Sequence, residues 1–350
     1  MEIRNISKSW DSASREDWLS IRTIDMHTGG EPLRVIMEGY PEIMGDTILE
    51  KRRYVRDNLD NLRKSLMWEP RGHADMYGLL LLPPERPDSD FGVLFMHNEG
   101  YSTMCGHATI AITKLAVESG WVEKKSPVTT LKIDAPCGQL TAYANIVNDL
   151  VEEVGFDNVP SFVVALDEKI HVGGLGEVTY DLAYGGAFYA YVDARKLGVD
   201  LTAGTYRELI EKGMAIKKAV MDKKLNVKHP FEDDLGFLYG TIFTGDPIGK
   251  DNHSRNVCIF ADGEVDRSAT GSGVSGRAAI HYERGELKIG EEIIIQSIIG
   301  STMSVSVKGT IDFGPYKSII PRISGNAYIT GRHEFLIDPE DPLKEGFILR

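Results

Sequence analysis

The chain has 350 residues, of which 42% are hydrophobic and 26% charged, and no low-complexity tract or long run of like charges interrupts it. This composition excludes a disordered or fibrous protein, and the length predicts two domains of comparable size. The 39 basic and 52 acidic residues leave a net charge of −13, spread along the chain, which argues against nucleic acid or an anionic membrane as a partner.

The N-terminal residues, the lengths of the apolar runs and the cysteines indicate where the protein is located and which kinds of site it can hold. The first twenty residues mix charges with Trp10 and Trp18, and no apolar run reaches the length of a membrane span, so we expect a cytoplasmic protein. Three cysteines, at positions 105, 137 and 258, follow no spacing typical of a disulfide framework. Cys105 and His107 could begin a metal site, but no matching ligand pair follows, and we expect no metal.

The first hundred residues read mainly as strands. Strands are expected at residues 21–25 and 33–37 around a Gly29-Gly30 turn, and again at 76–82 and 91–96. Between these pairs, a polar segment opening at Asp46 carries apolar residues at helical spacing, which predicts one surface helix. Those apolar residues are Val55, Leu59, Leu62 and Leu66.

A glycine-containing turn, Cys105-Gly106-His107, leads directly into an almost wholly apolar segment at 108–118. A helix that is apolar on most sides must be buried. Short strands are then expected from 129 to about 192, a helix at 205–224, and strands at 239–243 and 256–261.

The first turn is repeated about half a chain later. Thr270-Gly271-Ser272-Gly273 precedes a second helix rich in small and apolar residues at 274–282, and only strands follow. Thr28-Gly29-Gly30 and Tyr184-Gly185-Gly186, each preceding a strand, keep nearly the same separation. The repetition predicts a duplicated α/β (α+β) protein in which the strands of each half wrap a central helix.

The expected division of the chain follows from this repeat. Residues 1–20 form an N-terminal extension, residues 21–175 the first half and residues 176–338 the second. The C-terminal tail at 339–350 is a candidate to return to the first half.

If the halves face each other, the two turns place two helix N-termini across one cleft. Their unpaired N–H groups would bind a carboxylate, and the glycines allow close approach of the backbone. The helix terminus is expected to lower the pKa of the Cys105 thiol, giving a thiolate that acts as a nucleophile or as a base. A nucleophilic hydrolase that uses His107 or His73 as its base stays open at this point.

Structural roles compete with catalytic ones at several positions. Cys137 and Cys258 lie in strand-like surroundings, where a cysteine is expected to be a small buried hydrophobe. His73 could be a structural loop histidine, and Asp266 could be a turn residue.

Four sequence blocks, in the right order, resemble the signatures of the proline racemase family. They are Asp25-Met26-His27-Thr28-Gly29-Gly30-Glu31, Pro70-Arg71-Gly72-His73-Ala74-Asp75-Met76, Met104-Cys105-Gly106-His107, and Asp266-Arg267-Ser268 with Thr270-Gly271-Ser272-Gly273. Ala269 stands where the family commonly has proline. The resemblance implies the diaminopimelate-epimerase-like fold, with two similar halves, a site in the cleft between them, and no pyridoxal phosphate or metal cofactor.

One departure from the family pattern decides the expected activity. In the racemases two cysteines flank the α-carbon, whereas this chain has Cys105 at the first position and Thr270 at the second. A threonine hydroxyl is not appreciably ionised near neutral pH and cannot be the second α-proton base. The Cys/Thr pair is similar to that of trans-3-hydroxy-L-proline dehydratases, which implies loss of water to give pyrroline-2-carboxylate.

The resemblance also implies a role for each site residue. Cys105 would accept the α-proton, Asp266 would pair with the ring ammonium, and Thr270 would position the departing hydroxyl or a water. The substrate carboxylate would be held by Gly106, His107, Gly271 and Ser272. The sequence does not identify the acid that protonates the departing hydroxyl.

The expected partner is a small imino acid, and a homodimer stays open as the oligomeric state. A proline or hydroxyproline epimerase, in which a water on Thr270 reprotonates the opposite face, is the first alternative. A non-catalytic amino-acid-binding protein is the second.

Overall fold

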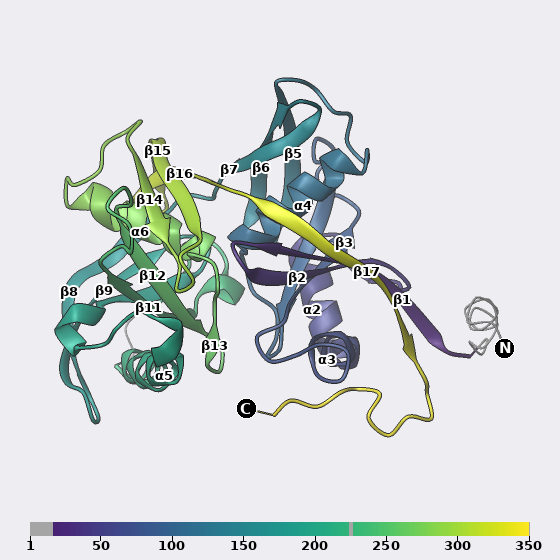
Figure 1. Ribbon diagram of the computed structural model, residues 1–350, viewed down its shortest axis with the longest axis horizontal. Coiled ribbons are helices and arrows are strands. Elements are labelled where there is room, and N and C mark those ends of the chain that lie inside the picture. Colours follow the sequence, from purple (N-terminus) through teal and green to yellow (C-terminus); the bar gives the residue numbers. More distant parts are fainter. Residues whose placement is uncertain (1–16, 224–226, 350) are drawn as a thin grey trace.

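Two helices, each surrounded by strands, organise the structure. The computed structural model describes residues 17–223 and 227–349, and it has two halves lying side by side (Figure 1). The first half contains β1 (Leu19–Thr28), β2 (Glu31–Glu38), α2 (Ile48–Asn58), α3 (Asp60–Met67), β3 (Tyr77–Leu82), β4 (Phe91–His97), α4 (Gly106–Glu118), β5 (Val128–Ala135), β6 (Gly138–Val147), β7 (Leu150–Asp157) and β17 (Ala327–Ile337).

The second half holds the remaining elements. They are β8 (Phe162–Val172), β9 (Gly176–Tyr184), β10 (Phe188–Asp193), η1 (Ala194–Leu197), η2 (Ala203–Thr205), α5 (Tyr206–Asp222), η3 (Asp233–Leu235), β11 (Leu238–Gly245), β12 (Ser254–Phe260), β13 (Glu264–Val265), α6 (Gly271–Glu283), β14 (Glu292–Gln296), β15 (Thr302–Phe313) and β16 (Tyr316–Gly325).

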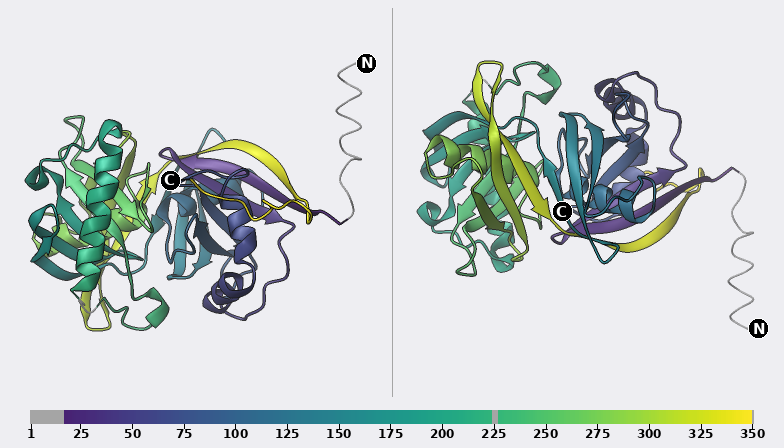
Figure 2. Two further views of the ribbon diagram at one scale, coloured as in Figure 1. Left: turned by 90° about the horizontal axis from the view of Figure 1, so that it is seen from below. Right: turned by 90° about the horizontal axis from the view of Figure 1, so that it is seen from above.

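The central helices match the two predicted buried helices. In α4 only Lys114 and Glu118 are not fully buried, and α4 packs against β1, β2, β6, β7 and β17. The helix α6 packs in the same way against β8, β9, β10, β15 and β16. The helix expected at 205–224 is α5, which covers the outer face of the second half (Figure 2).

The expected single surface helix is instead two helices. α2 begins after Thr47, whose side chain forms a capping box with Glu50, and it ends at Leu59. Leu59 has a non-helical backbone and precedes α3, so a turn interrupts the helical spacing that the sequence shows. No helix in the described residues is long and apolar enough to cross a bilayer.

The strand pairing favours a boundary between the halves other than the one expected near residue 175. β8 forms a hairpin with β9 and packs on α6, so a boundary at 175 would cut that hairpin. β17 pairs with β1 along its whole length, and β16 pairs with β7 where the halves join. We propose that the halves divide after β7 and again before β17, because the last strand returns to the first half.

The two ends of the chain meet the first half. Residues 1–16 of the expected extension lie outside the described residues, and Leu19 and Ser20 already pair with Ile337 and Leu336 in β17. Beyond β17 the tail lies along α3 and the following turn: the Phe347 N–H donates to the Glu69 carbonyl over 2.9 Å.

The first residues of α4 and α6 are in direct contact. A Cβ atom on Gly106 would lie 2.6 Å from the Gly271 Cα, and one on Gly271 would lie 2.7 Å from the Gly106 Cα. Real Cβ atoms do not approach this closely, so the two helix ends can meet only because both residues are glycine.

The paired-glycine turns pack against the same helix ends. Thr28, before Gly29-Gly30, donates its hydroxyl to the His107 carbonyl over 2.8 Å. The Gly186 carbonyl accepts a 2.6 Å hydrogen bond from the Thr103 hydroxyl, which ties the second half to the loop before α4. The first motif therefore holds the start of α4 within its own half, and the second motif ties the two halves together.

We expect Gly106→Ala to destabilise the protein, because the added methyl group would overlap the Gly271 backbone. Overpacking of this kind costs about 1–3 kcal/mol of unfolding free energy, which urea denaturation followed by circular dichroism would measure. Gly173→Ala is the matched control, since a methyl group there meets no atom within 4 Å. Equal loss of stability in the two variants would contradict the contact.

Candidate active site

All seven residues singled out in the sequence line one small cavity where α4 and α6 meet. They are Cys105, Gly106, His107, Asp266, Thr270, Gly271 and Ser272. His73, by contrast, is exposed and does not line this cavity, so it cannot serve Cys105 as a base. The Gly273 carbonyl accepts a hydrogen bond from the Tyr191 hydroxyl over 2.8 Å, outside the cavity lining.

Cys105 is the N-cap residue of α4 and is nearly fully buried. Its Sγ accepts a hydrogen bond from the Ala108 N–H over 3.4 Å and lies 3.2 Å from the His107 Nδ1. Burial raises the pKa of the Cys105 thiol well above its usual range; the Ala108 N–H lowers the pKa, and the Asp266 carboxylate raises it. The expectation of a lowered thiol pKa is therefore wrong, because desolvation outweighs the helix terminus.

His107 does not provide a positive charge beside this thiol. Burial lowers the pKa of His107 to about 4, so the imidazole is neutral near neutral pH. Its ring meets Tyr77 edge-on, with 4.7 Å between ring centroids. A neutral imidazole cannot hold Cys105 as a thiolate in the way that an imidazolium would.

Thr270 occupies the equivalent N-cap position of α6 in a different conformation. Its φ of 67° lies in the left-handed region, which is rare for a β-branched residue and costs about 1–3 kcal/mol. The conformation is held from two sides: the Thr270 N–H donates to Ser268 Oγ over 3.1 Å, and its hydroxyl donates to Asp266 Oδ2 over 2.8 Å.

Asp266 is fixed with its carboxylate at the cavity wall. Its Oδ1 accepts from the Ser268 N–H over 2.7 Å, and its own N–H donates to the Cys258 carbonyl over 3.1 Å. The neighbouring Arg267 pairs with Asp75 instead, and within the part of the chain that the structure describes no Lys, Arg or His forms an ion pair with Asp266 inside 4 Å. A buried carboxylate held in this way can receive a cation from a ligand.

The cavity is also lined by residues to which the sequence analysis gave no role in the site. Tyr77, Met104, Tyr189, Tyr239, Cys258 and Phe260 also line the cavity. The Tyr189 hydroxyl lies 2.8 Å from Ser272 Oγ, and the Tyr77 hydroxyl is hydrogen-bonded to Ser102. Cys258, which we expected to be structural, is fully buried but faces the site. Tyr77, Tyr189, Tyr239 and the pair Cys258 and Phe260 come from four different strands, and no local spacing signals them.

The cavity measures about 20 Å³, which is room for roughly one water molecule. A five-membered imino acid is larger, so the walls must separate before such a ligand enters. Among residues 17–223 and 227–349, no three His, Cys, Asp or Glu side chains gather as a metal site would require.

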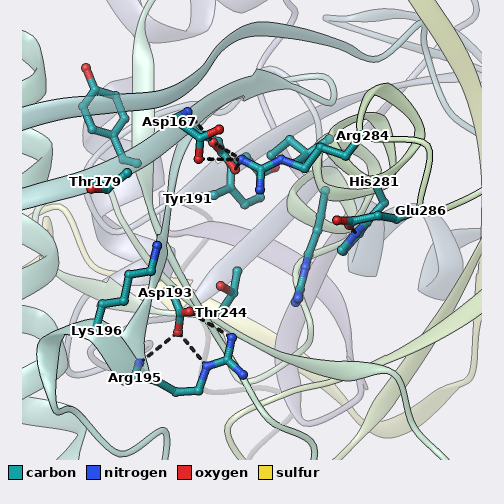
Figure 3. Close-up of a pocket in the computed structure, with 14 residues that line it drawn as sticks. Asp167, Thr179, Tyr191, Asp193, Arg195, Lys196, Thr244, His281, Arg284 and Glu286 are labelled. Carbon is teal, nitrogen blue, oxygen red and sulfur yellow. Dashed lines mark hydrogen bonds and ion pairs between the residues drawn. The ribbon is translucent and has the colours of Figure 1, made fainter.

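A larger polar hollow lies at the other end of α6, among β8–β10 and η1 (Figure 3). Arg284 pairs there with Asp167 and Asp181, and Arg195 pairs with Asp193. These charges largely neutralise one another and no cysteine lines the hollow, so the chemistry expected of Cys105 belongs to the smaller cavity.

Comparison with known proteins gives a consistent result. The family model described as proline racemase matches residues 23–348. A trans-3-hydroxy-L-proline dehydratase of Colwellia psychrerythraea is 51% identical, covering 96% of this chain and 94% of the relative, and the Homo sapiens protein of the same name is 44% identical, covering 94% and 95%.

A solved structure extends the comparison to the fold. A hydroxyproline epimerase from Agrobacterium vitis, with bound trans-4-hydroxy-L-proline, is 31% identical with a TM-score of 0.89, covering 96% of this chain and 97% of its own. The predicted fold of two halves around central helices is confirmed.

We expect Asp266→Asn to lower the pKa of Cys105, because the substitution removes a negative charge that disfavours the thiolate. The pH profile of Cys105 alkylation by iodoacetamide, resolved by peptide mass spectrometry, should move to lower pH. Cys137 is the internal control: burial raises its pKa to about 12, and Asp266 is not a cause. A Cys105 profile that stays in place or moves to higher pH would refute the electrostatic assignment.

Proposed function

This chain belongs to the proline racemase family, and we propose that it is a cofactor-independent trans-3-hydroxy-L-proline dehydratase. The observation that carries the proposal is the pair of residues at the two abutting helix ends, Cys105 on α4 and Thr270 on α6. One thiol and one hydroxyl supply a single α-proton base. The chain's similarity to two dehydratases over almost its whole length supports the same activity.

In this proposal Cys105 removes the α-proton. The substrate carboxylate lies at the N-termini of α4 and α6, held by Gly106, His107, Gly271 and Ser272. Charge develops on that carboxylate as the α-proton leaves, so fixed N–H donors stabilise the transition state more than the bound substrate. The contact between Gly106 and Gly271 supports this role, because it brings both sets of donors to one point.

Asp266 pairs with the ring ammonium, and this pairing activates Cys105. The negative charge of Asp266 is one cause of the raised thiol pKa, and a bound ammonium neutralises it. Substrate binding therefore removes this contribution to the raised pKa of Cys105. The thiolate is favoured more with the substrate bound than without it.

Thr270 acts as a positioning residue rather than as a base. Its hydroxyl already donates to Asp266, which leaves its oxygen free to accept from the 3-hydroxyl of the substrate or from a water. Racemisation needs a second base on the opposite face, and an unionised threonine does not provide one.

Two further expectations belong to this proposal. Three cysteines without disulfide partners are typical of a reducing compartment, in keeping with a cytoplasmic enzyme. The homodimer stays an open alternative for the oligomeric state.

The first test is a proton NMR time course in D2O with trans-3-hydroxy-L-proline, L-proline and trans-4-hydroxy-L-proline. We expect only the 3-hydroxy compound to give pyrroline-2-carboxylate. Cys105→Ser should lower that rate by about 10²–10⁴-fold, because a serine hydroxyl is not ionised near neutral pH. Inversion at the α-carbon of proline or 4-hydroxyproline, without any imine from the 3-hydroxy substrate, would instead identify an epimerase.

A second test introduces a thiol at position 270, where the racemases have their second α-proton base. Thr270→Cys should give measurable racemisation of L-proline, because a thiol then stands at both helix ends. Polarimetry or chiral chromatography would detect D-proline, and Thr270→Ser, which keeps a hydroxyl, is the matched control. If Thr270→Cys keeps its fold but racemises L-proline no faster than Thr270→Ser, the single-base explanation fails.

A further inference from the structure

Five residues that line the catalytic cavity carry a hydroxyl group, and four of these groups are engaged in hydrogen bonds. The Thr270 hydroxyl donates to Asp266, those of Tyr189 and Ser272 bond to each other, and that of Tyr77 bonds to Ser102. The fifth hydroxyl belongs to Tyr239. It is buried and makes no hydrogen bond of ordinary length in residues 17–223 and 227–349, although the Tyr77 hydroxyl lies near enough to lower its pKa.

A buried hydroxyl without a partner is destabilising, and its presence beside a reactive thiol requires an explanation. Tyr239 is 7% exposed, and its oxygen has no access to solvent. We propose that Tyr239 is the catalytic acid that protonates the departing 3-hydroxyl, its hydroxyl being the group left unpaired until substrate binds. This inference rests on the proposed dehydratase function and adds the residue that the reaction still lacks.

The ring of Tyr239 is held in place by aromatic neighbours. It stacks on Phe260 with 5.4 Å between centroids, and it meets Tyr189 and His97 edge-on at 5.8 Å and 5.9 Å. These contacts fix the ring without using the hydroxyl. A phenylalanine at this position would therefore keep the packing and lose only the acid.

A phenol suits the protonation step. Hydroxide is a poor leaving group, and a phenol, with an ordinary pKa of about 10, is a much stronger acid than water. Burial and the Glu264 carboxylate raise the pKa of Tyr239 further, so it carries its proton throughout the neutral range. By contrast, the Thr270 hydroxyl donates to Asp266, and His107 is neutral near neutral pH.

The elimination balances within these groups. The Cα–H bond breaks and the Cys105 thiolate takes the proton, while the released electron pair forms the Cα=Cβ double bond. The Cβ–O bond breaks, and the oxygen takes the Tyr239 proton and leaves as water. The products are a thiol, a phenolate, water and an enamine that tautomerises to the cyclic imine.

Tyr77 provides the return path for the proton. Its hydroxyl is near enough to Cys105 and to Tyr239 to lower the pKa of both. The thiol can pass its proton to the Tyr77 oxygen as Tyr77 passes its own proton to the Tyr239 phenolate. This transfer restores the thiolate and the phenol with which the substrate-bound enzyme began.

The experiment compares two leaving groups in wild type and Tyr239→Phe. With trans-3-hydroxy-L-proline, the variant should form imine about 10²–10⁴-fold more slowly, the usual contribution of a general acid. With trans-3-fluoro-L-proline, fluoride release should change little, because fluoride is a far weaker base and leaves without protonation. Exchange of the α-proton of L-proline with D2O should also be kept.

Tyr189→Phe is the matched control, because it removes another hydroxyl from the same cavity. We expect it to leave the ratio of hydroxyl loss to fluoride loss unchanged, whatever it does to both rates. A Tyr239→Phe variant that loses water at the wild-type rate, or that loses both leaving groups and α-proton exchange equally, would overturn the assignment. Failure of the wild type to dehydrate the 3-hydroxy substrate would instead refute the proposed function itself.

Discussion

The backbone contact between Gly106 and Gly271 is the constraint on which the rest of the site depends. Each glycine is the first residue of a central helix, and each lies where any side chain would overlap the other backbone. The contact joins two halves that are otherwise linked by strand pairing at their edges, such as β7 with β16. It also brings two sets of unpaired N–H groups to one point, which neither half could do alone.

The close contact between the two helix ends also affects whether the Cys105 thiol is protonated. A cavity that excludes water strengthens every interaction inside it, and it also disfavours an isolated charge. Burial therefore favours the protonated form of Cys105, and the nearby Asp266 carboxylate has the same effect. In the proposed mechanism the ring ammonium of the substrate pairs with Asp266, which links recognition of the substrate to formation of the base. The protonated thiol is also the form less reactive toward other electrophiles.

The two halves are similar in fold but differ at the residues that cap their central helices. Cys105 caps α4 in an extended conformation, whereas Thr270 caps α6 with a left-handed one. The thiol has a hydrogen-bond donor from its own helix, while the threonine hydroxyl is directed to Asp266. A duplicated framework has thus become a site with one base, which suits elimination better than inversion.

Much of this protein follows from local sequence. The apolar segments after Cys105-Gly106-His107 and Thr270-Gly271-Ser272 predict two buried helices with glycine-rich starts, and the similarity of the two turns predicts the duplication. The seven expected site residues belong to these turns or directly precede them, and short-range spacing carries that information. The prediction of a single surface helix is wrong. The apolar spacing continues across the turn at Leu59, so the sequence pattern does not show where α2 ends and α3 begins.

Only the tertiary structure decided the features that depend on distant segments. β17 returns to β1, which moves the division between the halves, and strand pairing over such separations leaves no periodic signal. Tyr77 and Tyr239 reach the cavity from strands in different halves, and only packing decides that the Tyr77 hydroxyl is hydrogen-bonded while that of Tyr239 is not. The direction of the Cys105 pKa shift depends on how much water the fold excludes from the thiol. The sequence pattern that predicts the start of a helix does not give this burial.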